Sequence, residues 1–202
     1  MSNPTTTPMG DDMAETVERV VRALAAGEVV ALPTDTVYGL AVDPNSAAAV
    51  ERLQELKRRP DQVPVALLVA SMEQTAELVE VTSLFQRLAR AHWPGKLTIV
   101  ATKHPEVSVY VGSDQTLGVR MPDHAFIHAL AKQFGPIAAT SANRHGEPTL
   151  LTAQAVCDHF GDDVEIVVDG GVLSEVASTV VDVTGPTLTV LRRGEVEVDM
   201  GQ

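Results

Sequence analysis

Short apolar runs typical of buried strands recur along the whole chain, between segments with helical spacing of apolar residues. Strands are predicted at residues 29–32, 65–70, 97–101, 117–121, 137–140, 165–168, 179–183 and 188–191. Helices are predicted at residues 11–26, 46–58, 124–134 and 152–160, and two more within 71–92, separated near 81–83. The order lacks the strict alternation of a doubly wound parallel sheet, and several strands follow one another closely near the C-terminus. We therefore expect an α+β (mixed α/β) fold with a mixed sheet.

The predicted elements give one domain with two short extensions. Residues 1–10 are rich in Thr and Pro without periodicity, which predicts a disordered lead-in. No stretch rich in Pro, Gly or Ser divides residues 11–194, so we expect a single domain there. Residues 195–202 are acidic and are expected to fray.

Composition excludes several classes of protein. The net charge of −12 weighs against general nucleic-acid binding, and the clearest cationic cluster is at residues 57–59. No apolar run is long enough to span a membrane, and the polar start lacks the features of a secretory signal, so a cytoplasmic protein is expected. Cys157 is the only cysteine, which excludes an intramolecular disulfide and a cysteine zinc cluster.

Four short motifs at the ends of predicted elements form the candidate site. They are Pro-Thr-Asp-Thr-Val-Tyr-Gly-Leu at 33–40, Lys-Arg-Arg-Pro at 57–60, Thr-Ser-Ala-Asn at 140–143 and Ser-Thr-Val-Val-Asp at 178–182. Each alone is compatible with ordinary turn or helix-end chemistry. Together their hydroxyls, amides and cations can surround an anionic ligand. We expect Lys57 and Arg59, rather than Arg58, to reach a polyphosphate.

Other familiar sites are missing from the sequence. It contains no Gly-x4-Gly-Lys-Ser/Thr loop, no Gly-x-Gly-x-x-Gly and no Gly-x-Ser-x-Gly elbow. His124 and His128 have the i,i+4 spacing of a metal pair, but no third ligand accompanies them. A solvated helix face is the better interpretation, and no metal site made of protein side chains is expected.

The ordered motifs resemble those of the YrdC-type threonylcarbamoyl-AMP synthases. The resemblance runs from about residue 27 to 194 and includes further signatures at 93–98, 118–123 and 191–194. It implies the single-domain form of the family, with a twisted, mostly mixed β-sheet around a large concave cavity and helices at its flanks. It also implies that L-threonine, bicarbonate and ATP give threonylcarbamoyl-AMP and pyrophosphate, for modification of the tRNA adenosine beside the anticodon.

The resemblance also implies roles for individual residues. The phosphate-binding and catalytic tetrad would be Lys57, Arg59, Ser141 and Asn143, with Thr116 and Arg192 also near ATP. The threonine site would comprise Thr34, Arg120, Ala139 and Ser178. Mg2+ would be held mainly by the phosphates and water, and a tRNA threonylcarbamoyltransferase would take the product.

The sequence departs from the family pattern at two places. Leucine, at 67 or 68, stands where relatives have a histidine, and Ala177 replaces a common proline before Ser178. The first change removes a polar group from the expected threonine side of the cavity. This change leaves open a paralogue that adenylates a different carbamate. A separate alternative is a non-catalytic RNA-binding or ribosome-associated module, against which the net charge of −12 weighs.

Overall fold

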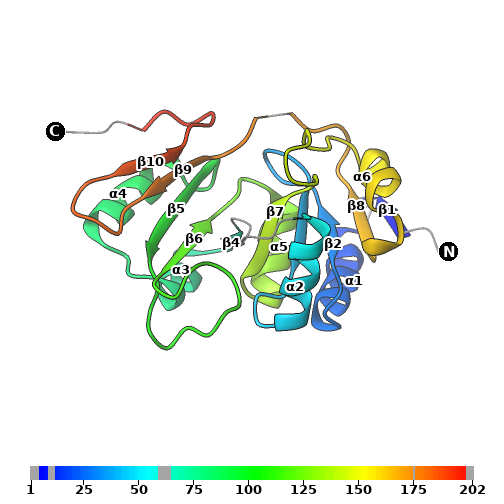
Figure 1. Cartoon of the computed structure of the whole chain (residues 1–202), viewed down its shortest axis with the longest axis horizontal. Coiled ribbons are helices and arrows are strands. Elements are labelled where there is room, and N and C mark those ends of the chain that lie inside the picture. The colour runs from blue at the N-terminus through cyan, green and yellow to red at the C-terminus, as the bar shows by residue number, and fades with distance from the viewer. Residues whose placement is uncertain (1–4, 9–11, 59–64, 175, 199–202) are drawn as a thin grey trace.

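The computed structural model describes residues 5–8, 12–58, 65–174 and 176–198. In these residues a single mixed sheet of ten strands runs along the long axis of the molecule (Figure 1), in the order β1-β8-β2-β3-β7-β4-β6-β5-β9-β10. The sheet contains both parallel pairs, such as β4 with β6, and antiparallel pairs, such as β5 with β6. The predicted mixed α/β fold is confirmed.

The strands are short, as the apolar runs predicted. Their bounds are Thr5–Pro8 (β1), Val30–Leu32 (β2), Gly39–Val42 (β3), Ala66–Leu68 (β4), Leu97–Thr102 (β5), Thr116–Arg120 (β6), Ile137–Ser141 (β7), Ile166–Asp169 (β8), Thr179–Asp182 (β9) and Thr189–Arg192 (β10). The helices are Met13–Ala25 (α1), Ala47–Leu56 (α2), Met72–Leu78 (α3), Ser83–His92 (α4), Ala125–Phe134 (α5) and Ala153–Phe160 (α6), followed by a 3-10 turn at Gly161–Asp163.

Side-chain caps explain where several helices begin. Asp12, Ser46 and Thr152 each accept a hydrogen bond from the backbone N–H three residues further on. Such caps satisfy N–H groups that have no partner inside the helix.

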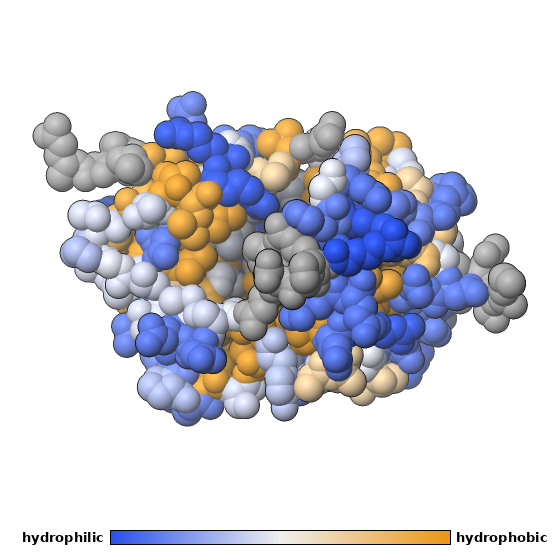
Figure 2. All heavy atoms as spheres, in the orientation of Figure 1, coloured by the Kyte–Doolittle hydropathy of each residue, from blue (hydrophilic) through white to orange (hydrophobic). Residues whose placement is uncertain are grey.

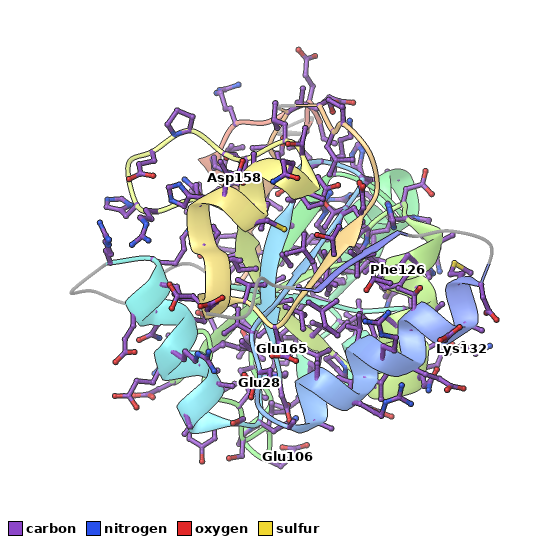
Figure 3. All side chains as sticks on the ribbon, turned by 90° about the vertical axis from the view of Figure 1, so that its right-hand side faces the viewer. Glu28, Glu106, Phe126, Lys132, Asp158 and Glu165 are labelled. Atoms are coloured by element: carbon purple, nitrogen blue, oxygen red, sulfur yellow. The ribbon has the colours of Figure 1, made fainter. Side chains whose placement is uncertain are left out.

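The sheet separates two apolar cores. On one face, α1 and α5 cover Val30 and Leu32 of β2, and on the other face Ala31 packs in a larger cluster with residues of α2, α4 and α6. Strands buried on both faces have continuous apolar sequences, as seen here. Figure 3 views the right-hand end of Figure 1, where α1, α2 and α6 lie on the outside and buried Phe126 of α5 lies within.

Three segments differ from the sequence-based expectations. Residues 5–8, expected to be disordered, form β1 beside β8, because their β-branched threonines suit an extended edge strand. Strand β3 was not predicted, and it pairs with both β2 and β7. In the expected fraying tail, the Val196 carbonyl accepts a 2.7 Å hydrogen bond from Thr179. Residues 199–202 lie outside the described residues.

Candidate active site

A cavity of about 470 Å3 lies over one face of the central strands. Its floor is a row of small residues that are direct neighbours across three strands: Ala139 of β7 pairs with Ala66 of β4, and Ala66 pairs with Gly118 of β6. All three line the cavity. Large side chains on this row would fill the space, so the hollow follows from the residues at these three positions.

The charge of the cavity walls is opposite to that of the chain. Among the described residues, the lining contains two arginines, Arg120 and Arg192, and no Asp or Glu, although the chain has a net charge of −12. Most of the predicted site residues line the cavity: Thr34, Thr116, Arg120, Ala139, Ser141, Ser178 and Arg192. A hollow with fixed cations, many hydroxyls and no carboxylate favours an anionic ligand.

Lys57 lies where α2 ends, and only 4% of its surface is exposed. Its ammonium donates hydrogen bonds of 2.7 Å to the Ser141 carbonyl and to Oδ1 of Asn143, and Oγ of Ser141 lies 3.5 Å away. The structure thus brings together three members of the predicted phosphate tetrad. Arg59, the fourth member, lies outside the described residues.

The turn after Lys57 has an unusual backbone. Arg58 has φ of +50°, the left-handed region that glycine adopts most easily, and its side chain is exposed. The Lys57 carbonyl accepts a hydrogen bond from the N–H of His145. The sharp turn therefore ends the helix and ties it to the loop after Asn143.

Ser141 and Asn143 are connected to each other as well as to Lys57. Oγ of Ser141 donates to Oδ1 of Asn143 at 2.7 Å, and Nδ2 of Asn143 donates to the Glu147 carbonyl at the same distance. This second bond fixes the orientation of the amide. The Ser141 hydroxyl can turn toward a ligand only by giving up its bond to Asn143.

Arg120 is one of the two arginines that line the cavity, whereas Lys57 and Asn143 are not among its lining residues. Its guanidinium donates to Oδ1 of Asp35 at 2.6 Å and to Oγ1 of Thr36 at 3.2 Å, and the Arg120 and Asp35 side chains are only 7% and 8% exposed. Burial lowers the pKa of Arg120, and the Asp35 carboxylate opposes that shift. Because Asp35 holds the charge in place, Arg120 can orient a ligand through its remaining surface.

Arg192 reaches Ser178 from the neighbouring strand. Its Nη2 donates to the carbonyl and to Oγ of Ser178, both at 2.9 Å, and Oγ of Thr98 lies 3.1 Å from the same hydroxyl. Strand β10 changes register against β9 between Val190 and Arg192. Such an irregularity re-aims the following side chain.

The electrostatic position of Arg192 differs from that of Arg120. Partial burial lowers its pKa, and repulsion by Arg120 adds to this shift. No carboxylate among the described residues lies within ion-pair distance of it. An anion between the two arginines would relieve their repulsion.

The remaining predicted residues line the cavity in different ways. The Thr34 hydroxyl donates to the Val37 carbonyl and accepts from the N–H groups of Thr36 and Val37, so its hydrogen bonds are used within its own turn. The hydroxyl oxygens of Thr116 and Ser113 lie 2.8 Å apart, within hydrogen-bond distance. Ala139 lines the cavity with its methyl group and offers no polar side-chain atom.

The departures from the family pattern have distinct positions. Leu68 lines the cavity beside Arg120, its partner in β6, whereas Leu67 is fully buried in the larger core. His128 lies on the helix and bonds the Pro122 carbonyl. Nδ1 of His124 is buried without a hydrogen bond among the described residues. These histidines therefore do not form the solvated face that was predicted.

Three residues that support the site were given no role in the sequence analysis, although each lies in a motif quoted there. Asp35 and Thr36 hold Arg120, and Thr98 contacts Ser178. A buried arginine needs a buried carboxylate, so Asp35 could have been found once Arg120 was placed inside. Thr98 could have been found from the period-two alternation of β5.

Comparisons with known proteins agree with the fold and extend over most of the chain. The family model for Sua5, YciO and YrdC, described as "Telomere recombination", matches residues 22–194. A threonylcarbamoyl-AMP synthase of Vibrio vulnificus is 36% identical over 163 residues, which cover 78% of this chain and 88% of that protein. The threonylcarbamoyl-AMP synthase of Pyrococcus abyssi is 40% identical over 172 residues, covering 83% of this chain and 51% of its own.

Two solved structures are similar to this chain over nearly its whole length. Pyrococcus abyssi Sua5 complexed with L-threonine superposes with a TM-score of 0.86 at 34% identity, covering 96% of this chain and 58% of that chain. The crystal structure of Escherichia coli YciO covers 98% of both chains with a TM-score of 0.89 at 24% identity, which supports the fold alone.

Proposed function

The chain belongs to the Sua5–YciO–YrdC family, and on this premise we propose that it is a threonylcarbamoyl-AMP synthase. Its substrates would be L-threonine, bicarbonate and ATP, and its products threonylcarbamoyl-AMP and pyrophosphate. The observation that carries the proposal is a cavity whose described lining residues include two arginines and no carboxylate, in a chain with a net charge of −12. Relatives named for this activity, at 36–40% identity, support it.

The reaction requires two anions to meet. The threonine amine attacks bicarbonate to give a carbamate and water, and a carbamate oxygen then attacks the α-phosphorus while pyrophosphate leaves. Neither step needs a nucleophilic side chain. Catalysis would come from placing the reactants in line and stabilising charge in a site from which water is largely excluded.

The described residues suggest a division of labour. Lys57, with Ser141 and Asn143, would bind the phosphates that leave as pyrophosphate, because they lie together where α2 ends. Arg120 and Ser178 would hold the threonine substrate. Arg192 donates a hydrogen bond to Ser178, and the charge of Arg120 repels it. It would therefore bind the anionic groups of the reactants where they meet between the two arginines. Arg59 would join the phosphate group by family resemblance.

Mg2+ fits this arrangement as an ion that the nucleotide brings with it. Among the described residues no group of three His, Cys, Asp or Glu side chains could hold a metal. Phosphate oxygens and water are the ligands that this ion prefers in nucleotide sites. When bound, it would neutralise charge on the departing pyrophosphate.

The test is a pyrophosphate-release assay with omission of single components. We expect release only when ATP, Mg2+, L-threonine and bicarbonate are all present. Release that does not depend on threonine, or no release from folded protein, would overturn the proposal.

One observation favours a second candidate, the adenylation of a different carbamate. Leu68 presents an apolar surface to the cavity beside Arg120, where the family pattern has a histidine. Replacing threonine by serine and other amino acids in the same assay separates the two. A higher rate with another amino acid would favour this candidate.

The product would pass to a partner enzyme, a tRNA threonylcarbamoyltransferase, rather than to tRNA bound by this chain. The net charge of −12 argues against a large nucleic-acid surface and against an RNA-binding module.

No helix in the described part of the chain has both the length and the apolar character needed to cross a membrane.

A further inference from the structure

A short segment after β10, residues 194–196, folds back on the start of β9, its neighbour at this end of the sheet (Figure 1). We call this segment the C-terminal strap. The Gly194 N–H donates to Oγ1 of Thr179 at 3.0 Å, and the same hydroxyl donates to the Val196 carbonyl at 2.7 Å. Thr179 is only 1% exposed and directly follows Ser178. One buried hydroxyl thus joins two backbone groups of the strap to the residue after Ser178.

The strap is also bound on the other side of Ser178. The N–H of Glu195 donates to the Ala177 carbonyl at 3.3 Å. The Glu195 carboxylate forms an ion pair with the ammonium of Lys96, whose carbonyl accepts a 3.0 Å hydrogen bond from the Thr179 N–H. Both residues that flank Ser178 are therefore held by the strap, and one of them is held by β5 as well.

The strap passes so close to β9 that residue 194 has no room for a side chain. The φ of Gly194 is not in the positive range, so its backbone conformation does not require glycine. A Cβ there would lie 2.5 Å from the carbonyl carbon of Ser178 and from the backbone nitrogen of Thr179. Because these are backbone atoms, they cannot turn aside as the end of a flexible side chain would. Any larger residue at 194 must therefore displace the strap or the segment beneath it.

Ser178 connects the strap with the cavity. Ser178 lines the cavity, whereas no residue of the strap is among the described lining residues. Its hydroxyl lies 3.1 Å from Oγ1 of Thr98 and accepts a 2.9 Å hydrogen bond from Arg192. These bonds fix the direction of the hydroxyl, and the strap fixes the backbone that carries it. The strap therefore acts on the cavity through Ser178, without contacting a ligand.

We propose that Thr179 and Gly194 are positioning residues for the amino-acid substrate, because they hold the strap against the segment that carries Ser178. This rests on the proposed function, which assigns Ser178 to the threonine substrate. A misplacement of about 1 Å at a group that orients a substrate can lower the rate about 100-fold. The proposed phosphate group is built on α2 and β7, so loss of the strap should affect threonine more than ATP.

The experiment measures the KM for L-threonine and for ATP in pyrophosphate release, and the Kd for L-threonine by calorimetry. Gly194→Ala should raise the KM and the Kd for threonine about 10- to 100-fold and the KM for ATP less. Gly185→Ala is the matched control, because Gly185 lies between β9 and β10 and the nearest listed atom to a Cβ there is 4.0 Å away. It should leave all three constants unchanged.

A second pair of variants tests the hydroxyl itself and decides the question if Gly194→Ala does not fold. Thr179→Val keeps the shape of the side chain and removes both of its bonds to the strap, so the KM for threonine should rise about 2- to 12-fold. Thr179→Ser keeps the hydroxyl and should restore the KM of the unmodified protein. Hydrogen exchange at the Gly194 N–H should be faster in Thr179→Val than in Thr179→Ser.

The outcomes distinguish this role from the synthase proposal. Unchanged threonine binding in folded Gly194→Ala and Thr179→Val, or equal increases in the KM for threonine and for ATP, would overturn the positioning role. An equal loss in Thr179→Ser would do the same, because the hydroxyl would then not be the cause. If the variants weaken threonine binding as expected but the unmodified protein releases no pyrophosphate, the positioning role stands and the synthase proposal fails. If the unmodified protein does not bind threonine, both are wrong.

Discussion

Two substitutions of Gly118 should have different effects. Alanine should make the protein more stable, and a larger side chain should weaken substrate binding. It lies within β6 on the row of small residues that floors the cavity. A Cβ built there would lie 3.5 Å from Cγ2 of Thr98 and 3.8 Å from Cγ2 of Val100, which are ordinary van der Waals distances. Its φ is not in the positive range. Gly118→Ala therefore introduces no clash and no backbone strain.

The magnitude follows from the cost of glycine in a strand. Alanine restricts the unfolded chain more than glycine does, so Gly118→Ala should raise the free energy of unfolding by about 0.5–1 kcal/mol. For a domain of this size, that corresponds to an increase in Tm of about 1–4 °C. The single methyl group occupies little of the cavity of about 470 Å3, so turnover should continue.

A longer side chain at the same position should separate stability from activity. Gly118→Leu would project into the cavity and should weaken substrate binding at least tenfold, or about 1.4 kcal/mol. Val119→Ile is the matched control, because Val119 is fully buried in the larger core, on the opposite face of the strand. It should change stability but not substrate affinity.

Two measurements check this reasoning: urea denaturation for stability, and threonine-dependent pyrophosphate release for substrate affinity. A loss of stability in Gly118→Ala would show that the space above Gly118 is not open. Unchanged substrate affinity in folded Gly118→Leu would show that the ligand does not lie over this row.

Three further predictions concern the charged groups. Lys57→Ala should lower the turnover of pyrophosphate release about 100- to 1,000-fold, because an electrostatic donor to the phosphates is lost. Turnover of the control Arg58→Ala should stay within about twofold of the unmodified protein, and equal losses in both variants would show that the wrong cation was chosen. Asp35→Ala leaves the buried Arg120 guanidinium without its carboxylate and should lower the free energy of unfolding by about 3–5 kcal/mol in urea; a loss below about 1 kcal/mol would contradict the pairing. Burial lowers the pKa of His124 from its ordinary 6.5, so the unfolded chain binds more protons and stability should fall as pH drops below about 6.5. His124→Gln should flatten that part of the profile, and an identical urea-denaturation profile would refute the assignment.

The sequence predicted most elements because their apolar patterns are local. Strand β3 was missed because its first two residues belong to the motif at 33–40 and all four are buried, so no alternation marks them. Strand β1 was missed because its threonines look polar in isolation and its partner strand, β8, is distant in sequence. Both misses concern segments whose structure depends on partners distant in sequence.

The sequence analysis predicted which residues form the candidate site but not the hydrogen bonds that connect them. The family resemblance implied Lys57, Ser141 and Asn143 as a group, and the structure brings these side chains into contact. Sequence could not assign the hydrogen bonds of Thr34 to its own turn, because a hydroxyl is equally suited to a turn and to a ligand. Nor could it pair Arg120 with Asp35, since 85 residues separate them.

The change of register in β10 has a consequence beyond its effect on Arg192. β10 is the outermost strand at its end of the sheet, and an outer strand exposes backbone groups that another chain could extend. Hydrophobic residues lie near β9 and β10 (Figure 2), and Leu191 on β10 is 57% exposed. A regular edge strand with such a surface would be prone to pair with other chains. The kink between Val190 and Arg192 breaks the regular backbone spacing that an incoming strand would need. The irregularity that directs Arg192 to Ser178 should thus also disfavour the addition of another chain's strand at this edge.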